Sequence, residues 1–220
     1  MKRKIESIGT CRLCKQNFSY NEIQKHLSAC KPYLDDKGNK NVFLIKAEMY
    51  PFWVYFEAEE NLTLKRVDRF LRELWLECCG HLSAFTIKNQ RYSVYEEELD
   101  FDEKSMNIKI GNVLEKGTKF NYEYDFGTTT ELLLVCISSK TGDNGIRVIA
   151  RNNLPAFSCE KCGKTAKNVC STCIWNFKGF VCTACSKKHK CGEEYLLPIV
   201  NSPRVGMCGF TGDACKLLNS

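Results

Sequence analysis

The sequence lacks the features that place a chain in or across a membrane. No apolar run approaches the roughly 20 residues that a bilayer-spanning helix requires. The basic start, Met1 to Lys4, is not followed by an apolar stretch, so it does not have the pattern of a secretory signal. These absences predict a cytoplasmic protein without a membrane partner.

A convincing catalytic constellation is also missing. In the run from Cys78 to His81, no residue is evident that would orient the histidine as a base for a thiol nucleophile. The triplet from Asp125 to Gly127 matches the magnesium motif of kinases, but the glycine-rich loop and catalytic loop of kinases are absent. The sequence therefore favours a protein that is not an enzyme and shows no small-molecule substrate site. An enzyme acting on nucleic acid is the alternative, and it requires convergence of Glu123, Asp125, Glu131 and His81.

Cysteine, by contrast, is abundant, with 15 residues in a chain of 220. Most of the cysteines come in Cys-x-x-Cys pairs with a histidine nearby, and there is no export signal. This spacing is typical of metal sites, because cysteines of a reducing compartment do not form lasting disulfides. The pattern predicts about three structural zinc ions.

The N-terminal candidate site is a zinc finger with the ligands Cys11, Cys14, His26 and Cys30. The first two cysteines have the spacing of a tight knuckle. The histidine and the last cysteine are four residues apart, so on a helix they lie one turn apart on the same side. The segment is expected to act either as a stabilised terminal cap or as a binding unit. The exposed helix residues of the binding unit would be Tyr20, Asn21, Gln24 and Lys25.

The C-terminal candidate sites comprise three Cys-x-x-Cys pairs and three single ligands, enough for two tetrahedral zinc ions. One predicted site combines the first and third pairs, and the second site combines the middle pair with two of the three single ligands. Spacing alone does not choose between the last two cysteines. The ligands in chain order are Cys159, Cys162, Cys170, Cys173, Cys182, Cys185, His189, Cys191 and Cys208.

Charge is unevenly distributed along the chain. Residues 1–40 carry a net charge of +5, residues 41–151 carry −4, and residues 152–220 carry +5. Because zinc binds the thiolate form of cysteine, the metal-loaded protein has a lower net charge than the formal +6, about +2. The ends stay basic and the middle acidic, a layout that suggests nucleic acid as one candidate partner.

The middle of the chain predicts an α+β domain with a mainly antiparallel sheet. A strand region rich in aromatic and β-branched residues runs from Val42 to Glu57, and Pro51 interrupts it. One principal helix starts at Thr63 and shows apolar residues at helical spacing up to Trp75. Later strands are expected at residues 84–87, 91–95, 119–125, 129–138 and 146–150, and residues 96–103 are expected to form an acidic loop.

Four segments of this region carry a resemblance to a known family. They are residues 62–64, 80–85, 110–114 and, above all, 122–127, the sequence Tyr-Glu-Tyr-Asp-Phe-Gly. The chain resembles the plasmid Ri ORF-three-like family, also described as a resolvase-like passenger protein of an insertion element. Many members continue the last motif with an acid, a Trp and a His, where this chain has Thr-Thr-Thr-Glu. Residues 197–212 resemble the zinc-bearing subgroup of the family, to which this chain adds the N-terminal finger. The resemblance to a resolvase-like protein implies a role in recombination.

These observations predict three parts. Residues 1–40 form a zinc finger with a basic linker, residues 41–153 form the ORF-three-like α+β domain, and residues 154–220 form a cross-braced module with two zinc ions. The leading functional hypothesis is a zinc-binding protein that associates with nucleic acid or acts as a regulator. The alternative is an adaptor that presents the aromatic stretch from Trp175 to Phe180 to a protein partner.

Overall fold

The computed structural model describes residues 5–36, 38–95, 100–176 and 178–217. The chain forms two compact units. The sheet unit comprises Ser7–Leu71 and His81–Asn153, and the terminal unit comprises Met1–Glu6, Arg72–Gly80 and Leu154–Ser220. Within the described ranges, none of the helices has both the length and the apolar character that crossing a bilayer requires.

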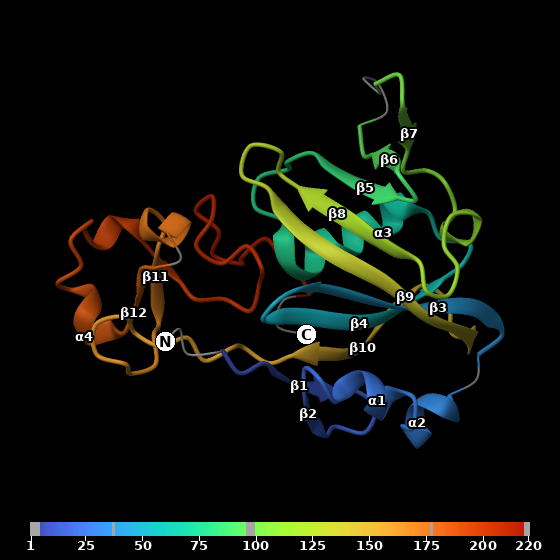
Figure 1. Ribbon diagram of the computed structural model, residues 1–220, viewed down its shortest axis with the longest axis horizontal. Coiled ribbons are helices and arrows are strands. Elements are labelled where there is room, and N and C mark those ends of the chain that lie inside the picture. The colour runs from blue at the N-terminus through green and yellow to red at the C-terminus, as the bar shows by residue number, and fades with distance from the viewer. Residues whose placement is uncertain (1–4, 37, 96–99, 177, 218–220) are drawn as a thin grey trace. The chain divides into compact units, whose positions relative to one another are not determined.

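The sheet unit is built on one large sheet of ten strands (Figure 1). Its order is β2-β1-β10-β4-β3-β9-β8-β5-β6-β7. Neighbouring strands run antiparallel except for β6 and β7, which are parallel. The strands are β1 Ile8–Cys11, β2 Asn17–Ser19, β3 Lys40–Met49, β4 Phe52–Glu59, β5 Ser83–Ile87, β6 Gln90–Ser93, β7 Glu103–Ser105, β8 Lys119–Tyr124, β9 Thr130–Gly142 and β10 Ile146–Asn152. The predicted α+β class with a mainly antiparallel sheet is confirmed.

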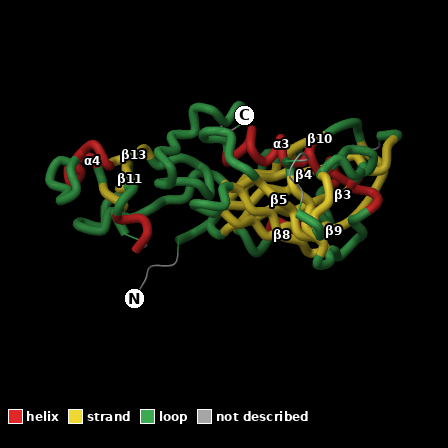
Figure 2. The backbone as a smooth tube through the Cα atoms, turned by 90° about the horizontal axis from the view of Figure 1, so that it is seen from above, coloured by secondary structure: helices red, strands yellow, loops and turns green. Residues whose placement is uncertain are grey.

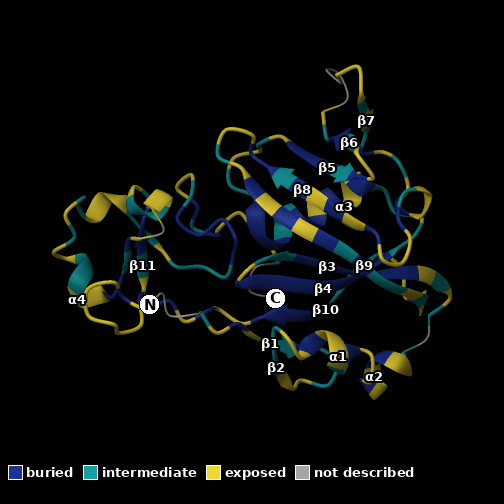
Figure 3. Ribbon diagram, in the orientation of Figure 1, coloured by how far each residue is buried: buried dark blue, intermediate teal, exposed yellow. Residues whose placement is uncertain are grey.

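Burial along the strands follows from their place in the sheet. The central strand β4 is buried over nearly its whole length, which explains its continuous apolar sequence. In β8, Phe120, Tyr122 and Tyr124 are buried and the residues between them are more exposed. Figure 3 shows the same alternation along β9. A period of two is expected for strands with one face on the core and one in water.

The principal helix is α3, Leu64–Leu71, and a π-helical turn continues it over Arg72–Leu76. The backbone N–H of Arg66 lies 3.3 Å from the Thr63 hydroxyl, so the threonine acts at the helix start as predicted. The helix packs on the sheet through Phe70, whose ring centroid lies 4.8 Å from that of Phe56 in β4.

Two hydroxyl groups bind the buried Asp68 of this helix. The side chains of Ser83 and Tyr122 each donate to Asp68 Oδ1 over 2.6 Å. These bonds tie α3 to strands β5 and β8. A carboxylate at this depth is tolerated because its charge receives hydrogen bonds.

The segment of the finger, from Ser7 onward, belongs to the sheet unit. Strand β1 pairs with β10, with Gly9 opposite Asn152, and β2 forms the outer edge of the sheet. The short helices α1 Ile23–Leu27 and α2 Lys31–Leu34 follow. The finger is therefore joined to the sheet by a backbone ladder formed between residues more than 100 positions apart. The division of the chain at residues 40 and 153 stays a prediction.

The terminal unit contains a small sheet of order β12-β11-β13. Its elements are β11 Asn168–Cys170, β12 Phe180–Val181, α4 Thr183–Ser186 and β13 Leu196–Pro198. Most of the remaining described backbone of this unit is loop (Figure 2). One cluster of its buried side chains consists of Cys159, Val181 and Cys182, with Cys185 and Leu196 packed against it. Two of these three residues are cysteines, and a structural metal commonly adds to the folding energy of so small a module.

Candidate metal centres

Four groups of cysteine and histidine side chains can hold metal ions. The expected geometry of such a site follows from bond lengths. With zinc–sulfur bonds of about 2.3 Å and zinc–nitrogen bonds of about 2.0 Å, tetrahedral ligands lie about 3.8 Å apart for two sulfurs and about 3.5 Å apart for sulfur and nitrogen. A disulfide would instead bring two sulfurs to about 2.05 Å, and none of the described cysteines forms a disulfide.

The first group is the predicted finger: Cys11, Cys14, His26 and Cys30. The sulfurs of Cys11 and Cys30 are 4.0 Å apart, and Cys14 Sγ lies 3.3 Å from His26 Nε2. The knuckle is closed by the backbone N–H of Lys15, which donates to the carbonyl of Cys11 over 2.8 Å. Burial lowers the pKa of His26, which favours the neutral imidazole that binds zinc. The Phe18 ring stacks on the histidine with centroids 3.8 Å apart.

The finger shares its core with the large sheet. Cys11, Cys30, Ile23 and Leu27 are buried in one cluster, and the sheet contributes its own side chains to that cluster. Among them is Trp53, which is fully buried. Ile23 and Leu27 lie one turn apart on the same side of α1. This side of the helix packs in one cluster with the ligands Cys11 and Cys30 and with side chains of the sheet. This arrangement supports the interpretation of the finger as a terminal cap of the sheet.

The second group brings together Cys159, Cys162, Cys182 and Cys185. The sulfurs of Cys162 and Cys182 are 3.6 Å apart, close to the tetrahedral value. The first pair forms a knuckle, in which Gly163 has φ +73° and donates to the carbonyl of Cys159. The second pair begins α4, and Cys182 precedes its first residue. The first and third Cys-x-x-Cys pairs of the C-terminal region therefore lie together, although the pair Cys170 and Cys173 separates them in sequence. This is the combination that the sequence analysis predicted.

The third group consists of Cys170, Cys173, His189 and Cys191. Cys173 Sγ lies 3.6 Å from His189 Nε2 and 3.6 Å from Cys191 Sγ. Of the two cysteines that spacing left open for this site, the structure places Cys191 here. Strand β11 ends at Cys170, and the short 3-10 turn that starts at Cys173 follows it.

Hydrogen bonds prepare part of these two terminal sites for a cation. Burial raises the pKa of Cys159, but backbone N–H groups of Cys182, Lys161 and Cys162 outweigh it and bring that pKa to about 6. Burial likewise opposes the shift at Cys170, where the backbone N–H groups of Cys173 and Thr172 and the His189 side chain bring the pKa to about 7. The lowered pKa favours the thiolate of Cys159 in one site and of Cys170 in the other, and thiolate is the form that binds metal.

The fourth group was not predicted as a metal site. Its thiols belong to Cys78, Cys79 and Cys208 of the terminal unit, and His81 follows Cys79 by two residues along the chain. Cys208 had been a candidate for the site at His189. Sequence spacing could not reveal this group, because 129 positions separate Cys79 from Cys208. The adjacent cysteines Cys78 and Cys79 were a local signal, but they lack the Cys-x-x-Cys spacing that predicts a metal site.

The residues considered for catalysis have other partners. Glu123 and Glu131 lie opposite each other on β8 and β9, and Glu123 pairs with Arg91. Asp125 is buried in a turn with φ +65°, and its Oδ1 accepts the backbone N–H groups of Gly127 and Thr128. His81 Nε2 lies 3.4 Å from Asp125 Oδ2. Residues 96–99 of the predicted acidic loop lie outside the described residues.

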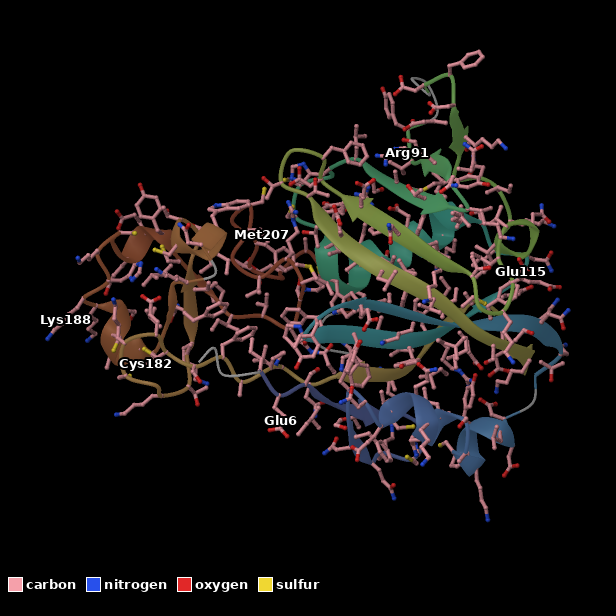
Figure 4. The ribbon with its side chains drawn as sticks, viewed as in Figure 1. Glu6, Arg91, Glu115, Cys182, Lys188 and Met207 are labelled. Atoms are coloured by element: carbon pink, nitrogen blue, oxygen red, sulfur yellow. The ribbon has the colours of Figure 1, made fainter. Side chains whose placement is uncertain are left out.

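The surface of the terminal unit is rich in lysine. All seven lysines between positions 161 and 190 are exposed: Lys161, Lys164, Lys167, Lys178, Lys187, Lys188 and Lys190. In Figure 4 the side chain of Lys188 extends away from the ribbon near α4, on the same part of the chain as the ligand Cys182. Two aromatic side chains are exposed nearby in sequence, Trp175 at 58% and Tyr195 at 45%. Phe177, part of the predicted aromatic stretch, lies outside the described residues.

Comparison with known proteins gives a family for residues 42–151 and does not give a function. A search of curated proteins gives no match. Among solved structures, a protein of unknown function from Methanosarcina mazei Go1 is 17% identical, with a TM-score of 0.43 over 57% of this chain and 76% of that chain. The family model described as plasmid pRiA4b ORF-3-like protein matches residues 42–151, half of the chain. These residues span β4, α3 and the strands up to β10, and they include the motif at 122–127. The chain therefore belongs to the plasmid pRiA4b ORF-3-like family.

Proposed function

We propose that this chain is a zinc-dependent, non-enzymatic nucleic-acid-binding protein of the cytoplasm, and that its terminal unit is the binding surface. The observation that carries the proposal is that all seven lysines between positions 161 and 190 are exposed. Lysine ammonium groups neutralise phosphates and release the counterions bound to them, which is the main source of affinity for nucleic acid without sequence preference.

The metal ligands hold these lysines in place. Lys187 and Lys188 directly follow α4 and precede the ligand His189, and Lys190 lies between His189 and Cys191. The fold of this stretch depends on both terminal sites, because Cys185 belongs to one of them and His189 to the other. Zinc thus acts on binding indirectly, by keeping the lysines of one short segment close together.

Two exposed aromatic rings favour single-stranded nucleic acid. Trp175 lies in the 3-10 turn that begins at the ligand Cys173. The carbonyl of Tyr195 accepts the backbone N–H of Ser171, two residues before the same ligand, over 2.9 Å. Both rings therefore come from backbone close to the third metal group. Unpaired bases stack on such rings, at about 1–3 kcal/mol per base.

Net charge alone would not justify the proposal. Residues 152–220 carry +5 before metal binding, and a four-thiolate site and a three-thiolate site reduce this to about +2. What supports the proposal is the local density of lysines. In this segment the acidic residues are fewer: Glu160, Glu193, Glu194 and Asp213.

The finger offers less for nucleic acid recognition. Helix α1 has five residues, and Ile23 and Leu27 are buried. The Tyr20 hydroxyl donates to Glu48 of β3, and the ammonium group of Lys46 lies 4.3 Å from the Tyr20 ring centroid. Tyr20 was predicted as an exposed helix residue, but it precedes α1 and is held against the sheet. The geometry supports a cap, and it leaves the terminal unit as the favoured surface.

The proposal is tested by fluorescence anisotropy with labelled single-stranded DNA, duplex DNA and structured RNA at several salt concentrations. The triple variant Lys187→Gln, Lys188→Gln, Lys190→Gln should bind more weakly. The slope of log affinity against log salt should fall by about 2 for single strands, because three phosphate contacts are lost. The matched control is Lys104→Gln, Lys116→Gln, Lys119→Gln, which removes three exposed lysines from the sheet unit. No salt-sensitive binding by the zinc-loaded wild type would overturn the proposal.

A protein-interaction adaptor is the second candidate, and the 58% exposure of Trp175 favours it. A large exposed indole is a frequent anchor of protein interfaces. Substitution of Trp175 by alanine should then abolish recovery of one defined partner from a pull-down, whereas the lysine triple variant should retain it. Loss of nucleic acid binding in the lysine variant with unchanged partner recovery would separate the two functions.

A further inference from the structure

Three thiols of the terminal unit converge although they come from distant parts of the chain. Cys79 Sγ lies 3.6 Å from Cys78 Sγ and 3.9 Å from Cys208 Sγ. All three sulfurs lie within 4.8 Å of one another. These separations match the 3.6 Å to 4.0 Å between sulfurs of the other three groups. They also match the value of about 3.8 Å for sulfurs around a tetrahedral zinc ion.

The backbone holds the two segments together independently of the thiols. The Ser202 hydroxyl donates to the carbonyl of Trp75 over 2.6 Å, and the backbone N–H of Leu217 donates to the carbonyl of Glu73 over 2.9 Å. The thiol of Cys215 lies 3.4 Å from the carbonyl of Arg72. Cys208 is thus flanked on both sides by residues bound to the segment that leads into Cys78. Convergence of the sulfurs is a consequence of this docking.

We propose that Cys78, Cys79 and Cys208 bind a fourth zinc ion through their three thiolates. All three residues belong to the terminal unit. Thiolate sulfur is a preferred zinc ligand, and the three sulfurs have the spacing of three corners of a tetrahedral site.

The local structure around the thiols fits a structural metal site. Gly80, directly after the paired cysteines, has φ +75°, and Cys208 itself has φ +47°. Positive φ is uncommon for cysteine and requires support from tertiary contacts. In residues 201–217, all of which are described, the backbone has neither helix nor strand. A metal bond at Cys208 would fix this irregular segment on Arg72–Gly80 and so close a loop of more than 100 residues.

The test begins with the zinc content of the full chain, purified under reducing conditions and freed of loosely bound metal. The wild type should contain four zinc ions per chain, and Cys208→Ser and Cys79→Ser should each contain three. Cys215→Ser is the matched control, because this buried cysteine lies on the same segment and outside all four groups; it should retain four. A wild type with three ions overturns the site.

A second measurement uses the unmutated protein, so it does not depend on the folding of a variant. Cys79 and Cys208 are exposed, and exposed thiols react quickly with N-ethylmaleimide unless a metal holds them. Peptide mapping by mass spectrometry should show both residues unmodified in the zinc-loaded chain and modified after a strong chelator is added. Rapid modification without chelator would refute the proposal. Protection that only a reductant removes would also refute it, because it would show a disulfide.

Discussion

The substitution Gly9→Ala tests whether the finger is a cap built into the sheet. Gly9 lies in β1 opposite Asn152 of β10. A Cβ atom at this position would lie 2.2 Å from the Arg151 carbonyl oxygen and 2.4 Å from Cη2 of Trp53. Non-bonded heavy atoms pack at about 3.5 Å or more, so both neighbours would have to move by about 1 Å.

Neither neighbour can move easily. The carbonyl is part of the ladder between β1 and β10, where Arg151 pairs with Thr10. Trp53 is fully buried, and its indole N–H donates to the Ser7 hydroxyl over 2.9 Å. Overpacking of this kind costs about 3 kcal/mol. In a unit of this size, such a loss lowers the melting temperature by about 6–12 °C.

The assay is thermal and urea denaturation of the zinc-loaded chain, followed by the circular dichroism of the strands. The control is Gly127→Ala, because a Cβ there meets a single atom, Asp125 Oδ1, at 3.5 Å. The control should unfold within about 0.5 kcal/mol of the wild type. If Gly9→Ala unfolds like the wild type at equal zinc content, then β1 is not docked on β10 and the finger is not a cap of the sheet.

Three further outcomes are expected. Tyr122→Phe removes a hydroxyl that donates to the buried carboxylate of Asp68 over 2.6 Å, and it should lower the free energy of unfolding by about 1.5–3 kcal/mol; equal stability of Tyr122→Phe and Tyr92→Phe in urea would contradict this. Cys191→Ser should remove one zinc ion and leave the site at Cys159 intact, since only the third group loses a ligand; metal analysis of the purified variant decides this. Zinc retention should also depend on acidity. The pKa of Cys159 is lowered from 9 to about 6 in the folded chain, so its contribution to stability is complete above pH 9 and is lost as the pH falls through 6. Protons compete with zinc for this thiolate, so release of zinc to a coloured chelator should increase as the pH falls, and release that is constant between pH 8 and pH 5 would contradict this.

Local sequence patterns were sufficient for most of the sheet unit. The helix was predicted from the apolar spacing of Leu64, Val67 and Leu71, which are all buried. Strands were expected at residues 84–87 and 91–95, close to the observed β5 and β6, and Asn89 in the turn between them has φ +65°. Pro51 was expected to interrupt the first strand region, and it lies between β3 and β4. Each of these features depends on residues close in sequence, so a single sequence contains enough information to predict it.

Features that depend on distant residues were not predicted. The pairing of β1 with β10 joins residues 9 and 152, and no local pattern specifies such a partner. The convergence of Cys208 with Cys79 has the same cause, because it follows from the docking of the C-terminal segment on Arg72–Gly80. The choice of Cys191 at the third group also required the structure, since either cysteine satisfied the spacing.

The central claim is that bound metal holds the terminal unit in its fold, and hydrogen exchange tests it most directly. Exchange should be measured by mass spectrometry on the zinc-loaded chain and on the same chain after zinc is removed under reducing conditions. The claim predicts that amides between Cys159 and Cys191 lose their protection on zinc removal, while those of β3 and β9 in the large sheet keep theirs. Unchanged protection of residues 159–191 in the metal-free chain would contradict it.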